Sequence, residues 1–186
     1  MHDQKRAELK LVNQYIIPFK GLKEGDYEFE FSFDRKFFDE HNLLEANGGH
    51  IVATILLSKK PGLLSLYTTL KGYLNIQCDR CIEEFDFPVY SRNQLLVKFG
   101  ENTGDSTDEI WVIEPNTYEL DMEQYLYECI SLSMPIQRIH PEDSDGKSGC
   151  NPEMLKKLEQ LSSTDATVKN SDPRWNALKN LFNDIN

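Results

Sequence analysis

The sequence predicts an α+β fold, with a mostly antiparallel sheet or a partial β-barrel in the N-terminal two-thirds and helices after it. Apolar and polar residues alternate through much of residues 27–113, which is the period of half-buried strands. After residue 120 the apolar residues recur at helical spacing. Strands followed by helices, without a βαβ pattern, indicate the α+β class. We expect one domain over residues 1–186, with strands mainly in 1–114 and helices with acidic loops in 115–186.

The first part of the sheet is predicted between residues 27 and 57. Residues 27–33 alternate strictly between aromatic and polar side chains, so we expect a half-buried strand there. A short helix is expected at residues 35–39, and Asn47-Gly48-Gly49 has the composition of a turn. Residues 51–57 then predict another strand.

Two longer strands follow, at residues 63–77 and 85–99. Each has its apolar side chains at alternate positions, so each is expected to bury one face. Gly72 interrupts the apolar row of the first strand, which favours a bulge or bend. Pro88 in the second strand favours an edge position or a bulge, because proline donates no hydrogen bond. Ile110–Ile113 predicts a short strand.

Helices are predicted in the remainder of the chain. Residues 121–134 have an apolar stripe at helical spacing, on which Cys129 is expected to pack as a small apolar residue. Asp121 with Gln124 resembles a capping box at the start of this helix. A second helix is expected from Pro152 to about residue 161, and a third after Asp172-Pro173.

Charge and composition exclude several classes of protein. The net charge is −11 and the mean hydropathy is −0.54, which is too polar for a membrane protein, while 11% aromatic residues are too many for a disordered chain. Residues 50–99 hold six basic and four acidic side chains, whereas residues 101–186 hold seven and 17. Extensive binding to a nucleic-acid backbone is therefore not expected, although a local basic face could contact RNA and the acidic half a basic protein.

The sequence also predicts a cytoplasmic protein. The apolar stretch at residues 11–19 is interrupted by Asn13, Gln14 and Pro18, so it does not resemble a signal peptide. No run approaches the ~18 apolar residues of a membrane-spanning helix. Four cysteines in a reducing compartment favour metal binding, catalysis or packing over disulfides.

A possible metal site is the main chemical feature of the sequence. Cys78-Asp79-Arg80-Cys81 is a CxxC motif in the expected turn between the two longest strands, a position typical of a zinc knuckle. A thioredoxin-type CxxC would lie at a helix N-terminus instead. Together with His140 and Cys150 the pair would form a Cys3His set, which suits a closed structural zinc site. Two thiols that merely cap the hairpin, or an ancestral site held by packing, remain alternatives.

Catalytic motifs are not found in the sequence. It contains no G-x-G-x-x-G, P-loop, G-x-S-x-G or H-E-x-x-H motif, so we expect no enzymatic activity and no small-molecule substrate.

The order of motifs from the CxxC hairpin to Cys150 resembles that of a known family. The C-x-R-C hairpin is followed by a helix that contains Glu128, Ile130, Leu132 and Pro135 in the order E-x-I-x-L-x-x-P, and then by His140 and Cys150. This order is similar to that of the YceD family, which is named for large ribosomal RNA subunit accumulation. The ending Asp172-Pro173-Arg174-Trp175 with Leu178 also resembles the family. The resemblance is good over residues 70–182 and loose over the first 60, and the loop before Cys150 is long here.

The resemblance implies a cytoplasmic, non-enzymatic factor in large-subunit ribosomal RNA accumulation and ribosome assembly. It also strengthens the zinc prediction, because Cys78, Cys81, His140 and Cys150 are the matching positions. The expected partner is ribosomal RNA or a ribosomal protein. We expect RNA contacts from four basic residues of the middle sheet: Arg80, Lys71, Arg92 and Lys98. The simpler interpretation is that these residues lie on ordinary solvent-exposed strand faces.

Two other functions remain open from the residues. A zinc-stabilised acidic adaptor could bind a basic protein through the C-terminal half. A CxxC thiol redox protein is a further alternative, which the position of the motif in a hairpin disfavours.

Overall fold

The structure is a computed structural model that describes residues 15–41, 46–101, 107, 109–142 and 144–162. The chain divides into two compact units, Met1–His140 and Pro141–Asn186, which are described separately. The single domain over 1–186 stays a prediction. The helix expected after Asp172 lies outside the described residues. None of the helices in the described ranges is long and apolar enough to cross a membrane.

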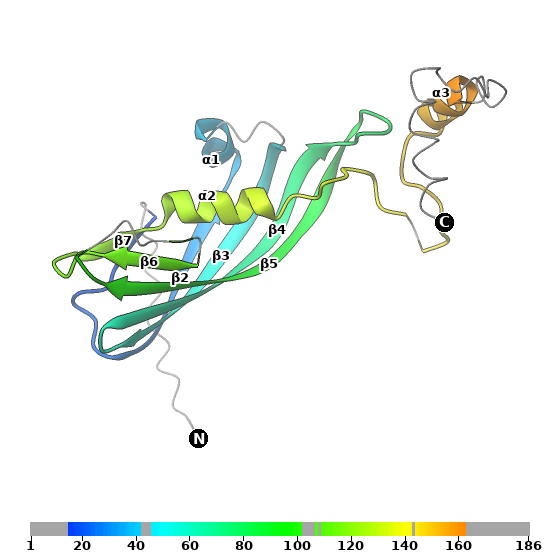
Figure 1. Cartoon of the computed structure of the whole chain (residues 1–186). Coiled ribbons are helices and arrows are strands. Elements are labelled where there is room, and N and C mark those ends of the chain that lie inside the picture. Colours follow the sequence, from blue (N-terminus) through cyan, green and yellow to red (C-terminus); the bar gives the residue numbers. More distant parts are fainter. Residues whose placement is uncertain (1–14, 42–45, 102–106, 108, 143, 163–186) are drawn as a thin grey trace, which may run out of the picture. The chain divides into compact units, whose positions relative to one another are not determined.

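The first unit is built on a five-stranded sheet (Figure 1). Its strands lie in the order β2-β3-β4-β5-β6: Gly25–Phe33, Ala46–Lys60, Leu63–Gln77, Glu84–Phe99 and Ile110–Ile113. All neighbours are antiparallel except β5 and β6, which pair in parallel. The short strands β1 (Ile16–Pro18) and β7 (Glu119–Asp121) form a separate antiparallel pair. The α+β prediction is confirmed, and the described sheet is open rather than closed into a barrel.

Alternation decides which face of this sheet is buried. Every even-numbered residue of β4 from Leu64 to Ile76 points to the core except Gly72, which has no side chain, whereas the odd-numbered residues are exposed or half-buried. The register continues this division across the sheet, because Leu66 lies opposite Leu57 on β3 and Leu95 on β5, and all three are fully buried. The strands predicted at 27–33, 63–77 and 85–99 are therefore confirmed.

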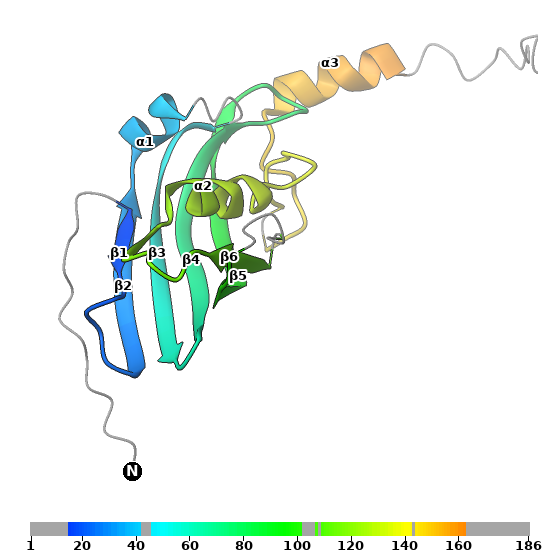
Figure 2. The ribbon, with the colours of Figure 1, turned by 60° about the vertical axis from the view of Figure 1, so that its left-hand side comes forward.

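The helices of this unit lie on the buried face. The short helix α1 (Arg35–Glu40) begins at Asp34, whose side chain accepts a hydrogen bond from the backbone N–H of Lys36 (3.0 Å). Helix α2 (Glu123–Leu132) crosses the sheet in front of β3 and β4 (Figure 2). Both helices contribute buried side chains to the same core as the sheet: Phe37, Phe38, Tyr125, Leu126, Cys129 and Ile130.

Two glycine-based predictions are wrong. The turn expected at Asn47-Gly48-Gly49 is part of β3, which starts at Ala46 and has a register shift between Ala46 and Gly48. The bulge expected at Gly72 is not seen either, since Gly72 lies in continuous register between Ile51 and Val89. Its role is a close approach of backbones, because a Cβ there would lie 2.0 Å from the carbonyl oxygen of His50. Its φ of +154° also disfavours other residues.

The edge position predicted from Pro88 is confirmed. Strand β6 pairs with β5 only from Leu96 to Phe99. Among the described strands Pro88 is therefore paired on one side only, with Tyr73 of β4, as an edge position requires.

The predicted capping box of α2 is wrong in detail. The Asp121 carboxylate does accept a hydrogen bond from the backbone N–H of Glu123 (2.9 Å). The Gln124 side chain does not return to the cap but donates to the Glu128 carboxylate (2.7 Å). The hydrogen bond from Gln124 to Glu128, one turn further along the helix, therefore replaces the reciprocal bond of a capping box.

The second unit contains helix α3 (Pro152–Ser162), as predicted. Asn151 precedes it, and its side-chain oxygen accepts hydrogen bonds from the backbone N–H groups of Glu153 (2.9 Å) and Met154 (3.4 Å). This capping explains why the helix starts at Pro152, where a missing N–H costs nothing.

Cys129 is buried in the core, as the apolar stripe predicted, with 6% of its surface exposed. Burial and, to a lesser extent, the Glu128 charge raise the pKa of its thiol from 9.0 to about 11, against the hydrogen bond with Tyr125. Cys129 is therefore a neutral packing residue at neutral pH.

We expect Gly72→Ala to destabilise the protein by about 3 kcal/mol or more, because the new Cβ collides with the His50 carbonyl and the positive φ is strained. Chemical denaturation would measure the loss, and failure to fold would agree with it. Gly21→Ala is the matched control, since nothing lies within 4 Å of its added Cβ. A loss below about 0.5 kcal/mol for Gly72→Ala would contradict this account.

A second prediction concerns alkaline pH. The unfolded chain ionises the Cys129 thiol above pH 9, whereas the native protein does so only near pH 11, so stability is lost across this range. Relative to wild type, Cys129→Ala should flatten the fall of the unfolding free energy between these two pH values by about 2 kcal/mol. Cys129→Ser, which keeps a polar atom without the titration, should flatten it equally. Identical pH slopes in all three proteins would show that Cys129 does not contribute.

Candidate metal centre

The CxxC motif forms the tight turn between β4 and β5, as predicted. The turn is closed by hydrogen bonds from the backbone N–H of Cys78 to the Glu83 carbonyl and from that of Ile82 to the Cys78 carbonyl, both 2.9 Å. The N–H of Arg80 points at the sulfur of Cys78, at 3.4 Å. Ile82 has a φ of +67°, which is costly for a β-branched residue. Such local strain is typical of functional turns.

The segment after α2 is fastened to this turn by reciprocal contacts. Asp79 donates its backbone N–H to the Arg138 carbonyl (2.7 Å), and Arg138 donates its N–H to the Asp79 carboxylate (2.9 Å). The guanidinium also lies 3.2 Å from that carboxylate. These hydrogen bonds and the charge of Arg138 lower the pKa of Asp79. The pair of Asp79 and Arg138 was not predicted from the sequence, because the two residues lie 59 positions apart.

This fastening places His140 beside the cysteines. Nδ1 of its ring lies 3.4 Å from Sγ of Cys81. The His140 ring also packs against the ring of Phe85, and the two ring centres are 4.4 Å apart. The histidine is thus held by packing on the first residues of β5.

Three predicted ligands are therefore brought together within the first unit. One ligand atom from each of Cys78, Cys81 and His140 lies within 4.8 Å of the others. Both cysteines are buried, with 1% and 3% of their surface exposed. Two sulfurs and one imidazole nitrogen are a donor set that zinc and similar metals prefer, so these residues could hold a metal ion.

The turn also favours the ionised form of one thiol. Burial raises the pKa of Cys78, but backbone hydrogen bonds from Cys81, Arg80 and His140 and a side-chain hydrogen bond from His140 outweigh it and lower the pKa from 9.0 to about 6. The thiolate is the form that binds metal. The fold therefore prepares Cys78 as a ligand.

Cys150, the fourth predicted ligand, belongs to the second unit. It is buried and ends a loop closed by a bridge between Glu142 and Ser148 and by a hydrogen bond from the Gly149 N–H to the Pro141 carbonyl (3.2 Å). Its N–H donates to the Ser148 hydroxyl (3.3 Å). Its role as a ligand stays a prediction.

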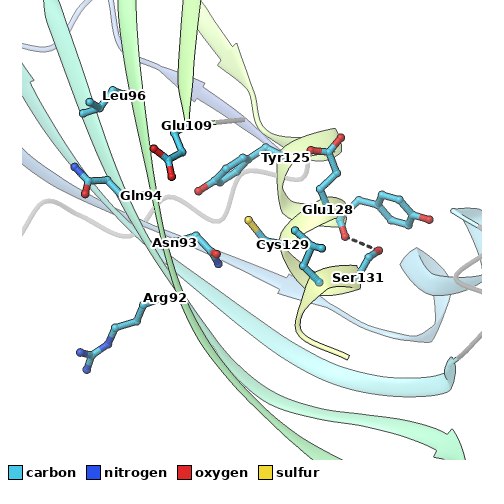
Figure 3. Close-up of a pocket in the computed structure, with 11 residues that line it drawn as sticks. Arg92, Asn93, Gln94, Leu96, Glu109, Tyr125, Glu128, Cys129 and Ser131 are labelled. Atoms are coloured by element: carbon cyan, nitrogen blue, oxygen red, sulfur yellow. Dashed lines mark hydrogen bonds between the residues drawn. The ribbon is translucent and has the colours of Figure 1, made fainter. Parts of the chain in front are cut away.

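A cleft of about 810 Å³ lies between β5 and α2 (Figure 3). Its walls include the carboxylates of Glu109 and Glu128, the thiol of Cys129 and the ring of Tyr125. Figure 3 shows Arg92 directed away from the cleft. The cleft is acidic and was not predicted from the sequence, because its walls come from three separate segments.

The predicted RNA contacts occupy different places. Lys71, Arg92 and Lys98 are exposed at the strand positions that point away from the core, whereas Arg80 is exposed in the hairpin turn. Lys59, another basic residue of the sheet, donates to the backbone carbonyls of Phe19 and Leu22, both at 2.8 Å. Tyr67 and Tyr90 are exposed on the same face and were not predicted as contacts, although their alternation with buried residues could have indicated them.

The family comparison covers both the hairpin and the segment that follows it. The model of the family "Large ribosomal RNA subunit accumulation protein YceD" matches residues 66–182, which is more than half of the chain. No curated protein and no solved structure matches. The match includes Cys78, Cys81, His140 and Cys150, so the residues of the candidate centre lie within the family region. The chain therefore belongs to the YceD family of large ribosomal RNA subunit accumulation proteins.

Proposed function

We propose that this protein is a non-enzymatic, cytoplasmic factor in large-subunit ribosomal RNA accumulation, which acts in ribosome assembly by binding ribosomal RNA. The family match over residues 66–182 is the observation that supports this most. The chain contains no common catalytic motif, and its chemical groups converge on a metal-ligand set rather than on a nucleophile with a base.

The metal in this proposal is one structural zinc. Tetrahedral zinc needs four protein ligands in a closed site. Cys78, Cys81 and His140 supply three, and we assign the fourth to Cys150, which is buried and lies in the family region. The backbone next to Cys150 is held by the bridge at Ser148 and by the hydrogen bonds of Gly149 and Cys150, so the thiol is presented from a fixed backbone.

The thiol redox alternative has less support. The CxxC turn is followed by strand β5 and not by a helix, so no helix N-terminus stabilises a thiolate there. The low pKa of Cys78 arises from hydrogen bonds within the turn and with His140, which is also expected of a metal knuckle. A metal bound by the CxxC cysteines would exclude thiol redox exchange, so the metal content of the protein tests this alternative.

A basic ribosomal protein is the second candidate partner. The acidic cleft between β5 and α2, with Glu109 and Glu128 on its walls, favours a cationic ligand over a phosphate. Crosslinking of the protein in cells, followed by separate analysis of bound RNA and bound protein, would distinguish the two partners.

We expect about one zinc per chain in protein purified without added metal or chelator, because four N/S ligands form a closed site. Cys78→Ser and Cys150→Ser should lose the metal and lower the melting temperature. Cys129→Ala is the matched control and should keep the zinc, since Cys129 lies in the core with Tyr125. A metal-free wild type, or full zinc in Cys150→Ser, would refute the Cys3His site.

We further expect depletion of this protein to lower the amount of large-subunit ribosomal RNA relative to small-subunit RNA. The ratio would be measured from total RNA before and after depletion, and again after the wild-type chain is restored. An unchanged ratio would contradict the proposed function, whatever the protein binds in solution.

A further inference from the structure

The face of the sheet opposite α1 and α2 has an unusual surface. The side chains of β4 and β5 on this face form cross-strand pairs: Tyr67–Gln94, Thr69–Arg92, Lys71–Tyr90 and Tyr73–Pro88. None of these side chains is buried, and no helix of the described first unit packs on them. We call Tyr67, Lys71, Tyr73, Tyr90 and Arg92 the tyrosine platform.

The three tyrosines of the platform are exposed although aromatic rings are costly to leave in water. Tyr67, Tyr73 and Tyr90 expose 47%, 43% and 57% of their surface. Tyr73 and Tyr90 are diagonal neighbours on adjacent strands, since Tyr73 lies opposite Pro88. Diagonal neighbours are about 7–8 Å apart, so the two rings offer separate, adjacent surfaces. Paired strands hold both backbones in place, which reduces the entropy lost on binding.

Two cations flank Tyr90, the most exposed ring of the platform. Nζ of Lys71 lies 6.0 Å from the centre of the Tyr90 ring, and the guanidinium carbon of Arg92 lies 5.3 Å from it. Both distances are within the range of a cation–π attraction. The cations therefore stay beside the ring, where a negatively charged group on a bound ligand would meet them.

The platform is free of acidic side chains in a strongly acidic protein. The neighbouring outward positions of β3, opposite Thr69, Lys71 and Tyr73, are Thr54, Val52 and His50. The nearest acidic residue of this face is Asp86, the other diagonal neighbour of Tyr73, whose carboxylate accepts a hydrogen bond from the Asn75 side chain (3.0 Å). The remaining acidic residues lie further out: Glu84 near the CxxC turn, and Asp26, Glu28 and Glu30 on β2. Lys71 and Arg92 thus make the surroundings of Tyr90 locally positive, although the net charge of the chain is −11.

We propose that the tyrosine platform binds single-stranded RNA. Tyr73 and Tyr90 stack on successive unpaired bases, and Lys71 and Arg92 contact the phosphates between them. Single strands suit this surface because their bases can leave the stack and lie on an open sheet, whereas the bases of an RNA duplex are enclosed. A basic protein segment fits less well, since it would meet Lys71 and Arg92. The inference rests on the proposed function and names the surface through which the protein contacts RNA.

The test is binding of a fluorescein-labelled single-stranded 12-nucleotide RNA of mixed sequence to the full-length protein, measured by anisotropy at about 50 and 200 mM salt. Tyr90→Ala should weaken binding about 5- to 100-fold, which corresponds to the loss of one stacked base. Tyr90→Phe keeps the ring and should restore binding. Tyr118→Ala removes a tyrosine with 64% of its surface exposed outside the platform, and should bind like wild type.

The cations are tested by salt dependence. Lys71→Ala and Arg92→Ala should each lower the slope of log affinity against log salt by about 1, because each removes one phosphate contact. Lys23→Ala is the control for a general charge effect, since Lys23 is exposed outside the platform. Thermal melting of each variant would show that the fold is intact, as expected for half-exposed positions.

Each outcome decides the proposal. Wild-type binding that is lost in Tyr90→Ala and retained in Tyr118→Ala supports it. Equal binding by wild type and Tyr90→Ala overturns it, as does a wild-type protein that binds no RNA at either salt concentration. The depletion experiment is independent of both results. If depletion lowers the large-subunit RNA but the protein binds no RNA, the role in RNA accumulation is retained and the contact is assigned to a protein partner.

Discussion

The register between β4 and β5 is the constraint on which the rest of the first unit depends. Because side chains alternate between faces, one register places Leu64, Leu66 and Leu70 in the core and Tyr67, Lys71 and Tyr73 on the open face. A slip by one residue would exchange the two sets, at the cost of exposing most of the core of the strand. The same register fixes where the hairpin turns, and so where Cys78 and Cys81 lie.

The CxxC turn adds a second, polar constraint to this apolar one. The ligand residues come from positions 78–81 and 140, which the sheet alone would not bring together. The reciprocal bonds between Asp79 and Arg138, with the stacking of His140 on Phe85, supply the missing connection. Because Asp79 and Arg138 satisfy one another through both backbone and side chain, the connection does not need the metal. A bound ion would then reinforce a geometry that the polypeptide already forms.

Sequence reasoning succeeded where one periodic signal dominated. The strand at 63–77, the position of the CxxC turn and the core role of Cys129 each follow from a local pattern of alternation or helical spacing. The prediction failed where the role of a residue depends on a contact with a residue that is distant in the sequence. Gly49 and Gly72 were interpreted as turn and bulge signals, but a Cβ on either would collide with the backbone of the adjacent strand. Arg138 gave no signal either, because its partner Asp79 lies 59 residues away.

The distribution of charge connects these features to RNA. A protein with net charge −11 gains little from non-specific attraction to phosphates, so any affinity must come from a small site where the field is reversed. Lys71 and Arg92 form such a site around Tyr90, and the acidic residues of β2 lie on the same face beyond β3. Stacking would then supply much of the affinity, while the surrounding negative charge would disfavour long duplex RNA. This balance would suit the proposed binding of unpaired RNA segments.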